Sequence, residues 1–197
     1  MTILKAPFPD LPDAHLRYLP GFLKPRETQV LMDRLEQEVP WQQDPIRVFG
    51  KTYPQPRLTA LYGEAGSSYG YSGIRMQPLP FTPALSELKD MVEAEAGCTF
   101  NICLLNLYRD GQDSNGWHAD NEKELGTNPA IASLSLGASR WFHLKHRREA
   151  AHRYKVLLEN GSLLLMQGAM QHHWLHQLPK TQKPLEARIN LTFRKVV

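Results

Sequence analysis

The run Arg188-Ile189-Asn190-Leu191-Thr192-Phe193-Arg194 alternates polar and apolar residues without a break. Successive side chains of a β-strand point to opposite faces, so Ile189, Leu191 and Phe193 are expected to pack on one side. The other side then carries two arginines, an asparagine and a threonine. An antiparallel strand with one solvated face would show the same alternation, so residues elsewhere in the chain must decide what this polar face meets.

A second strand-like run, from Phe100 to Tyr108, is mostly apolar and carries Asn106 and Tyr108 on one face. His118 follows ten residues after Tyr108, and Asp120 lies two positions further on. A histidine and an aspartate two apart in an extended segment can both reach one metal ion. With a distant histidine they form the two-histidine, one-carboxylate set that suits Fe(II) and dioxygen chemistry. The sequence therefore predicts a metal site.

Three histidines close together in the chain are candidates for the third ligand: His172, His173 and His176. In an extended segment His172 and His176 would share a face, and His173 would point the other way. Alternation alone therefore leaves this choice open.

The order of these motifs resembles the AlkB family of Fe(II)- and 2-oxoglutarate-dependent dealkylating dioxygenases, over about residues 20–197. The order is Asn-x-Tyr, His-x-Asp, a histidine twelve residues before an arginine, and a second arginine six residues further on. The resemblance implies that His118, Asp120 and His176 are the metal ligands and the catalytic residues. It also implies a 2-oxoglutarate site made of Asn106, Tyr108, Arg188, Asn190, Thr192 and Arg194.

Two arginines on an inward face would need a dianion, because a buried guanidinium is costly unless its charge is paired. 2-Oxoglutarate offers two carboxylates: one meets a guanidinium, while the keto acid end chelates the metal. Arg188 and Arg194 are about 20 Å apart along an extended strand, so we expect them to have separate tasks. Either each binds one end of the co-substrate, or one binds it and the other orients Asp120.

The region between Trp41 and Pro80 is rich in proline, glycine and tyrosine, which predicts short strands and hairpins. Residues 48–51 resemble a hairpin tip with which one animal subgroup of the family probes duplex DNA. Residues 56–64 instead resemble a sister subgroup active on single strands and RNA. An enzyme that attacks a base edge must take the base out of the stack, and an apolar ring can fill the gap that the base leaves.

The predicted substrate-binding residues follow from this resemblance. Phe49 is the wedge, on a tight turn with Gly50 and Lys51. The base pocket is made of Tyr69, Tyr71 and His118, with Ser72 nearby. The alternative for the tyrosines is cross-strand packing, and the alternative for Phe49 is a contact with the domain itself. Asn121 and Glu122 complete the set: Asn121 stands where the family usually has an acidic residue, so the preferred base adduct stays open.

Composition sets the broad class of the chain. Its 197 residues with 42% apolar content suit one domain, and a mean hydropathy of −0.44 without a long apolar run argues against a membrane protein. Two cysteines, Cys98 and Cys103, suit a reducing compartment. The first residues do not resemble a signal peptide, so we expect a cytoplasmic protein, nucleoid-associated in a bacterium or nuclear in a eukaryote. We expect a monomer.

Charge is distributed unevenly. Residues 140–197 hold eleven lysines and arginines against three acidic residues. Such a cluster is a candidate phosphate-binding surface, and a solvated strand face is the alternative. Its members are Arg140, Lys145, Arg147, Arg148, Arg153 and Lys155.

The predicted organisation is an irregular arm over residues 1–20 and one dioxygenase domain over 21–197. Within that domain, nucleotide-recognition hairpins occupy about 41–80 and the catalytic core about 100–197. Pro25 should start a helix that runs to about Val39 and buries Val30, Leu31 and Leu35. A second helix should start at Pro83, bury Leu85, Leu88, Met91 and Val92, and stop at Gly97. After Tyr108 we expect five strands, over residues 131–136, 141–145, 154–158, 162–167 and 188–193.

Helices that buttress a run of antiparallel strands predict a mainly β fold with flanking helices, a double-stranded β-helix (a cupin-like jelly roll). By the resemblance, the expected function is oxidative demethylation of bases such as 1-methyladenine and 3-methylcytosine in DNA. The reaction uses dioxygen, releases formaldehyde, and converts 2-oxoglutarate to succinate and CO2. The alternatives are an RNA demethylase, a hydroxylase of a protein or small molecule, and a non-catalytic binding module.

Overall fold

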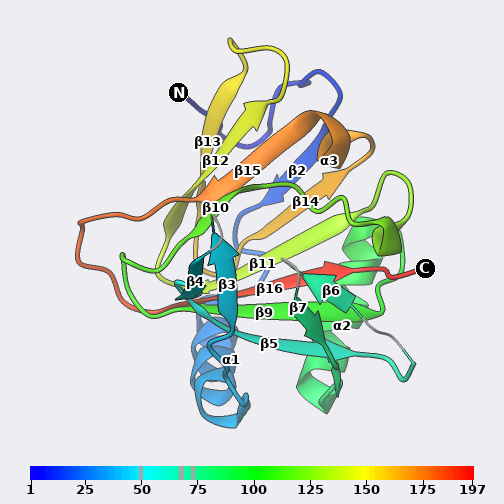
Figure 1. Ribbon diagram of the computed structural model, residues 1–197, viewed down its shortest axis with the longest axis vertical. Helices are drawn as coiled ribbons and strands as arrows, with labels where there is room; N and C mark the ends of the chain where they lie inside the picture. The colour runs from blue at the N-terminus through cyan, green and yellow to red at the C-terminus, as the bar shows by residue number, and fades with distance from the viewer. Residues whose placement is uncertain (49–50, 67–68, 72–73) are drawn as a thin grey trace.

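The computed structural model describes residues 1–48, 51–66, 69–71 and 74–197. Two β-sheets and two long helices form its body (Figure 1). The strands of the larger sheet run β2-β14-β11-β16-β9-β5-β8, and all neighbours are antiparallel except β5 and β8. Their bounds are His15–Leu19 (β2), Leu58–Gly63 (β5), Leu79–Pro80 (β8), Ile102–Tyr108 (β9), Ile131–Gly137 (β11), Leu163–Gln167 (β14) and Arg188–Arg194 (β16).

The smaller sheet has five strands in the order β1-β13-β12-β15-β10, and β10 forms one edge. Its pairs are antiparallel except β1 with β13. The bounds are Thr2–Ile3 (β1), Asn115–His118 (β10), Arg140–His146 (β12), Arg153–Leu158 (β13) and Trp174–Leu178 (β15). Apolar side chains of both sheets form one core cluster, which includes Leu104 and Met166 from the larger sheet and Leu144 from the smaller one. The two sheets therefore pack face to face.

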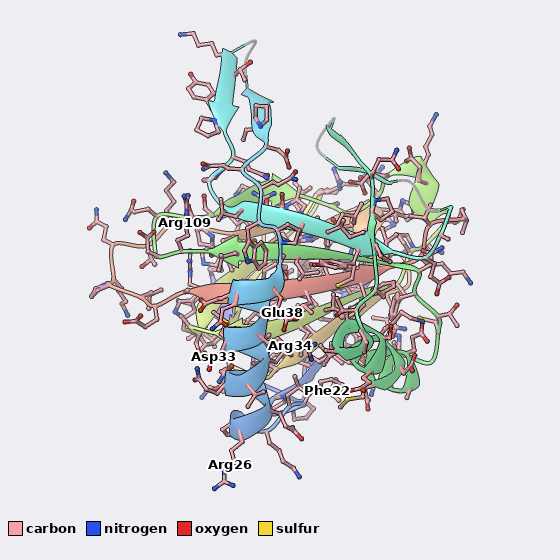
Figure 2. The ribbon with its side chains drawn as sticks, turned by 90° about the horizontal axis from the view of Figure 1, so that it is seen from below. Phe22, Arg26, Asp33, Arg34, Glu38 and Arg109 are labelled. Atoms are coloured by element: carbon pink, nitrogen blue, oxygen red, sulfur yellow. The ribbon has the colours of Figure 1, made fainter. Side chains whose placement is uncertain are left out.

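Two helices, α1 (Pro25–Glu38) and α2 (Pro83–Ala96), cover the other face of the larger sheet (Figure 2). Their buried residues share a second core cluster with Ile189, Leu191 and Phe193 of β16. Both helices start at the predicted proline. The hydroxyl of Thr82 accepts a hydrogen bond from the backbone of α2, and Gly97 ends that helix with φ 69°.

The predicted apolar faces of the helices are partly wrong. Val30 is 69% exposed and Met91 is 45% exposed. Helix α1 instead buries Thr28, Met32 and Leu35, which are four and three residues apart and so lie on one face. Thr28 and Met32 lie on the same helix face as Leu35, whereas Val30 lies on a different face. The face with Thr28, Met32 and Leu35 is therefore the one that packs on the sheet.

Short elements complete the chain. Strands β3 (Pro45–Val48) and β4 (Lys51–Pro54) form a hairpin that projects from the body (Figure 2). The other short elements are the hairpin of β6 (Tyr69–Tyr71) with β7 (Ile74–Met76), the 3-10 helix η1 (Lys123–Leu125) and the single turn α3 (Met170–His173). Hairpins were predicted in this region, but β5 within it is a buried strand of the larger sheet.

The predicted irregular arm is in part regular. Residues 15–19 form β2, which pairs along its whole length with β14, and residues 2–3 form β1 at the edge of the smaller sheet. The hydroxyl of Tyr18 donates a hydrogen bond to the carbonyl oxygen of Leu157 at 2.8 Å. No helix among the described residues is long and apolar enough to cross a membrane.

Candidate active site

The polar face of β16 lies in the protein interior. All seven residues of the strand are buried. Ile189, Leu191 and Phe193 pack toward the helices, so the four polar side chains point the other way, into the space between the two sheets. The positive charges of Arg188 and Arg194 must therefore be paired with carboxylates or other polar partners, because the buried side chains are not solvated by bulk water.

The three predicted metal ligands come together in this space. His118 ends β10, and its register partner on the antiparallel strand β15 is His176. Asp120 follows two residues after β10. The Nε2 atoms of the two histidines are 3.1 Å apart, and each lies 4.0 Å from a carboxylate oxygen of Asp120. One ligand atom from each residue lies within 4.8 Å of the others, which is a span that one metal ion can bridge.

The surroundings orient the side chain of His118 and the backbone at Asp120. The Nδ1 of His118 lies 2.7 Å from the carbonyl oxygen of Gly116. A carbonyl only accepts, so Nδ1 carries the ring hydrogen and Nε2 presents a lone pair. The side-chain oxygen of Gln171 accepts a hydrogen bond from the backbone N–H of Asp120 at 3.0 Å. The Nδ2 of Asn115 lies 3.2 Å from the Nε2 of His118. Two imidazoles and a carboxylate are a donor set that fits a divalent cation.

Electrostatics also favour a cation at this point. Burial, followed by the neighbouring His118, lowers the pKa of His176 to about 3. Burial likewise lowers the pKa of His118. Burial alone would raise the pKa of the Asp120 carboxyl, but the charges of Arg194, His176 and His118 and the hydrogen bond from Arg194 together outweigh it, and the pKa falls to about 2. At neutral pH two neutral imidazoles and one carboxylate face each other, and these are the protonation states that bind metal.

One pocket joins this group to the predicted co-substrate residues. Its lining includes all three predicted metal ligands and all six predicted 2-oxoglutarate residues: His118, Asp120, His176, Asn106, Tyr108, Arg188, Asn190, Thr192 and Arg194. The pocket walls are completed by apolar side chains such as Phe142, Leu158 and Met166. The nine residues come from both sheets, so the pocket exists only because β10 and β15 face β9 and β16.

Arg188 is a buried cation that is well placed to bind an anionic ligand. Its side chain is 2% exposed, its Nη2 donates to the hydroxyl of Ser135 at 3.0 Å, and its guanidinium lies 5.3 Å from the ring centre of Tyr108. The Nε atom is buried and has no hydrogen-bond partner in the described structure. Burial lowers the pKa of Arg188 to about 10. A ligand carboxylate at this position would satisfy the charge and the donor together.

Asn190 and Thr192 have less to offer a ligand than the sequence predicts. The amide nitrogen of Asn190 donates to the Ser133 hydroxyl at 2.8 Å and to the Leu134 carbonyl at 2.9 Å. The hydroxyl of Thr192 donates to the amide oxygen of Asn190 at 2.9 Å. Their donor hydrogens are therefore committed to the protein, and what remains for a ligand is the acceptor capacity of the Thr192 hydroxyl and of the Asn190 amide oxygen.

Arg57 is a pocket-shaping residue that the sequence analysis missed. It is buried, and its Nε donates to the side-chain oxygen of Asn106 at 2.8 Å while its Nη1 donates to the carbonyl oxygen of Ser114. This hydrogen bond fixes the orientation of the Asn106 amide, so its NH2 group can donate to a ligand in the pocket. An arginine at the start of a strongly apolar strand was the available signal. Gln171 was missed because a lone glutamine in a histidine-rich turn carries no pattern.

The structure contains a second histidine and aspartate group. His146 Nε2 and His173 Nδ1 lie 3.5 Å and 3.4 Å from Oδ2 of Asp13. However, Nδ1 of His146 accepts a hydrogen bond from the backbone N–H of Glu149 at 3.0 Å. In a neutral ring Nε2 then carries the hydrogen and points at the carboxylate, so this group does not present the lone pair that a metal needs. His172 is exposed.

The predicted substrate-binding residues are only partly described. Phe49, Gly50 and Ser72 lie outside the described residues. Tyr69 and Tyr71 lie in β6, but the structure describes only their backbone. Of the remaining three, Lys51 and Asn121 are exposed and Glu122 is half-buried.

The predicted phosphate-binding cluster contains one error. Arg140 is 3% exposed, and its guanidinium donates to the backbone carbonyl oxygens of Asp110, Asp113 and Pro179. It therefore holds two loop segments together, residues 110–113 and Pro179, rather than facing solvent. Charge alone does not separate such an arginine from a surface one.

A sequence profile described as the 2OG-Fe(II) oxygenase superfamily matches residues 15–194. A match over that share of the chain places it in this superfamily. The Rattus norvegicus protein named "Alpha-ketoglutarate-dependent dioxygenase alkB homolog 3" is 45% identical over 186 residues, which cover 90% of this chain and 62% of that protein. The Mus musculus protein named "DNA oxidative demethylase ALKBH2" is 39% identical over 181 residues, which cover 87% of this chain and 76% of that protein.

Within the superfamily, the chain belongs to the AlkB family, as its motifs predict. A solved structure titled "The structure of OsALKBH1" has the same fold, with a TM-score of 0.67 at 19% identity over 91% of this chain and 97% of that one. The prediction of a mainly β, jelly-roll fold is thereby confirmed. Membership implies iron and 2-oxoglutarate as the reactive groups. The chain spans less than two thirds of the length of the alkB homolog 3 relatives.

Proposed function

We propose that this protein oxidatively demethylates N-methylated bases, such as 1-methyladenine and 3-methylcytosine, in DNA. Succinate, CO2 and formaldehyde are the co-products. The observation that carries the proposal is the single pocket in which a two-histidine, one-carboxylate group adjoins a buried arginine that lacks an anion. The names of the similar proteins, a dioxygenase and a DNA oxidative demethylase, support the same class of reaction.

In this proposal His118, Asp120 and His176 hold Fe(II). Bound iron would use dioxygen as the oxidant and 2-oxoglutarate as the co-substrate oxidised with the methyl group, and the chain's own residues position the reactants. Arg188 binds the far carboxylate of 2-oxoglutarate, with its Nε donor available beside the bond from Nη2 to Ser135. Asn106, oriented by Arg57, and Tyr108 add neutral hydrogen bonds.

Arg194 has a different task in the proposal. Its Nη2 donates to Oδ1 of Asp120 at 3.0 Å, which is the second of the two arrangements expected from the sequence. The contact holds the carboxylate ionised and fixes which oxygen turns toward the metal. Thr192 and Asn190 keep the floor of the pocket in place through their mutual hydrogen bond.

The proposed base-binding elements lie at the hairpins. Strands β3 and β4 pair up to Val48 and Lys51; Phe49 and Gly50 lie between them in the sequence and outside the described residues. Phe49 is the proposed wedge because an apolar ring can insert into a base stack. The family resemblance of residues 56–64 to the subgroup active on single strands favours a single-stranded substrate as the second candidate.

A turnover panel tests the proposal. Oligonucleotides of DNA and RNA that carry one methylated base, each single-stranded or annealed, are incubated with Fe(II), 2-oxoglutarate and ascorbate, and formaldehyde and succinate are measured. We expect the two products in equal amounts from DNA. Succinate formation without formaldehyde from every oligonucleotide would rule out the proposed function. Phe49→Ala should depress turnover on duplex more than on single strands, and equal losses would remove the wedge role.

A further inference from the structure

The outer face of the smaller sheet carries an unusual combination of side chains. Along β12, Phe142 and Leu144 point into the core between the sheets. Trp141, His143 and Lys145 alternate with them and are half-buried on the opposite face. An aromatic ring, an imidazole and a lysine therefore lie in a row where the sheet faces away from the larger one.

Neighbouring strands extend this row. Trp117 of β10 lies beside His143, with ring centres 6.5 Å apart. The Nζ of Lys145 lies 4.3 Å from the ring centre of Trp117, and the Nζ of Lys155 on β13 lies 4.4 Å from that of Trp141. These are cation–π contacts. We call Trp117, Trp141, His143, Lys145 and Lys155 the outer platform.

The charge of this face is of one sign. Strands β10, β12, β13 and β15 contain no aspartate or glutamate. Arg153, exposed at the start of β13, adds a further cation next to Lys145, its register partner. Burial and the charge of Lys155 lower the pKa of His143, so its ring beside Trp117 is neutral at neutral pH. The platform therefore offers three flat rings beside two lysines on strands that carry no acidic residue.

We propose that the outer platform binds the single-stranded nucleic acid that flanks the methylated base held in the active site. Flat rings that stack bases, combined with cations that meet phosphates, are how proteins bind single strands without sequence preference. On binding, bases stack on the indoles and the two ammonium groups move from the rings to the phosphates. This inference rests on the proposed function, because the nucleic acid that binds the platform is the substrate whose methylated base is in the active site.

The platform is continuous with the active site. Trp117 directly precedes the predicted ligand His118, and the two lie on opposite sides of β10: Trp117 contacts His143 and Lys145 on the outer face, while His118 lines the active-site pocket. Strand β10 is an edge of the sheet, so a chain leaving the pocket can pass around it. From β10 to β13 is three strand spacings, or about 14 Å. At about 3.4 Å per nucleotide this needs roughly four nucleotides beyond the lesion.

Length dependence gives the test. Binding of a fluorescein-labelled thymidine 12-mer without any methylated base is measured by anisotropy at several salt concentrations. The variants are Lys145→Gln/Lys155→Gln and Trp141→Leu. The control is Lys24→Gln/Arg26→Gln, which removes two exposed charges at the start of α1, on the far side of the larger sheet (Figure 2). Turnover of a methylated trinucleotide, too short to reach the platform, is measured in parallel.

The double lysine variant should reduce the slope of log affinity against log salt by about 1.4, since each lost phosphate contact contributes about 0.7 for single strands. Trp141→Leu should weaken binding of the 12-mer by about tenfold. The control should change neither quantity by more than about twofold. All variants should process the trinucleotide like the parent protein.

Unchanged 12-mer affinity and salt slope in both platform variants would overturn the inference, as would a parent protein that binds no single strand at low salt. Loss of trinucleotide turnover in these variants would also overturn it, because the platform would then act on the active site itself. If the parent protein and variants bind the 12-mer as expected but no methylated substrate is turned over, the proposed function fails and the platform remains.

Discussion

The guanidinium of Arg194 donates from Nη2 to Oδ1 of Asp120 at 3.0 Å, and the two side chains are 3% and 2% exposed. The charges of a pair buried this deeply depend on each other, because removal of one partner leaves the other as an unpaired buried charge. We expect Arg194→Met to raise the pKa of Asp120 and to lower the free energy of unfolding by about 3 kcal/mol or more.

The measurement is urea unfolding of the metal-free protein, together with Fe(II) or Co(II) titration. Arg194→Met should weaken metal binding because a protonated Asp120 is a poor ligand. Arg26→Met on the exposed side of α1 is the matched control and should change neither property. Unaltered metal affinity in Arg194→Met would show that Arg194 does not set the state of Asp120.

Gln171 should act as a positioning residue for the metal site. It is buried, and its side-chain oxygen accepts the backbone N–H of Asp120 at 3.0 Å. Gln171→Met keeps the size and removes the acceptor. We expect metal affinity to fall by about tenfold, with a stability loss of about 1–3 kcal/mol from the unpaired N–H. Gln171→Glu, which retains an acceptor, should keep more of the metal affinity, and an equal loss in the two variants would contradict the role.

The turn between β11 and β12 should tolerate only glycine at position 137. Gly137 has φ 79°, and a Cβ there would collide with the carbonyl oxygen of Ala187, just before Arg188. Gly137→Ala should therefore cost about 2–5 kcal/mol in the free energy of unfolding. Gly21, with φ 68° and no atom within 4 Å of an added Cβ, is the matched control, and Gly21→Ala should cost about 1–2 kcal/mol. If Gly137→Ala and Gly21→Ala lowered the free energy of unfolding by similar amounts, measured by heat or urea, the collision at position 137 would be relieved and the prediction wrong.

The ion pair of Asp113 with Arg109 should make stability depend on pH. Burial raises the pKa of the Asp113 carboxyl, but hydrogen bonds from the side chain and backbone of Arg109 outweigh this and lower it. A carboxyl whose pKa is lower in the folded state stabilises the protein above its ordinary pKa of about 4, and this stabilisation is lost as pH falls. Asp113→Asn should therefore lose less stability than the parent between pH 7 and pH 3. Parallel unfolding curves of the two proteins across that range would contradict the prediction.

The sequence predicts the site better than the surfaces around it. The alternation of Arg188 to Arg194 fixes the face on which each side chain lies, since strand geometry leaves no freedom there. That the polar face is internal required the motifs upstream. Val30 and Met91 were expected to be buried because a pattern of apolar residues does not show which of two neighbouring helix faces meets the sheet.

Contacts between distant segments were not predictable from spacing. Arg140 was grouped with surface cations, although it binds three carbonyl oxygens from loops up to 39 residues away in the chain. Likewise, Arg57 and Gln171 orient residues 49 and 51 positions away. Side chains of this kind are recognised only when the fold brings their acceptors within reach.

One measurement tests the central claim most directly. A single-stranded DNA oligonucleotide with one 1-methyladenine is incubated with Fe(II)-loaded protein and 2-oxoglutarate, and formaldehyde is measured for the parent protein and for His118→Ala. The account predicts formaldehyde equal to the succinate formed by the parent. It predicts none from His118→Ala, which should still bind the oligonucleotide within about twofold. Formaldehyde release by His118→Ala at the parent's rate, in protein whose metal content is verified, would contradict the assignment of the iron site.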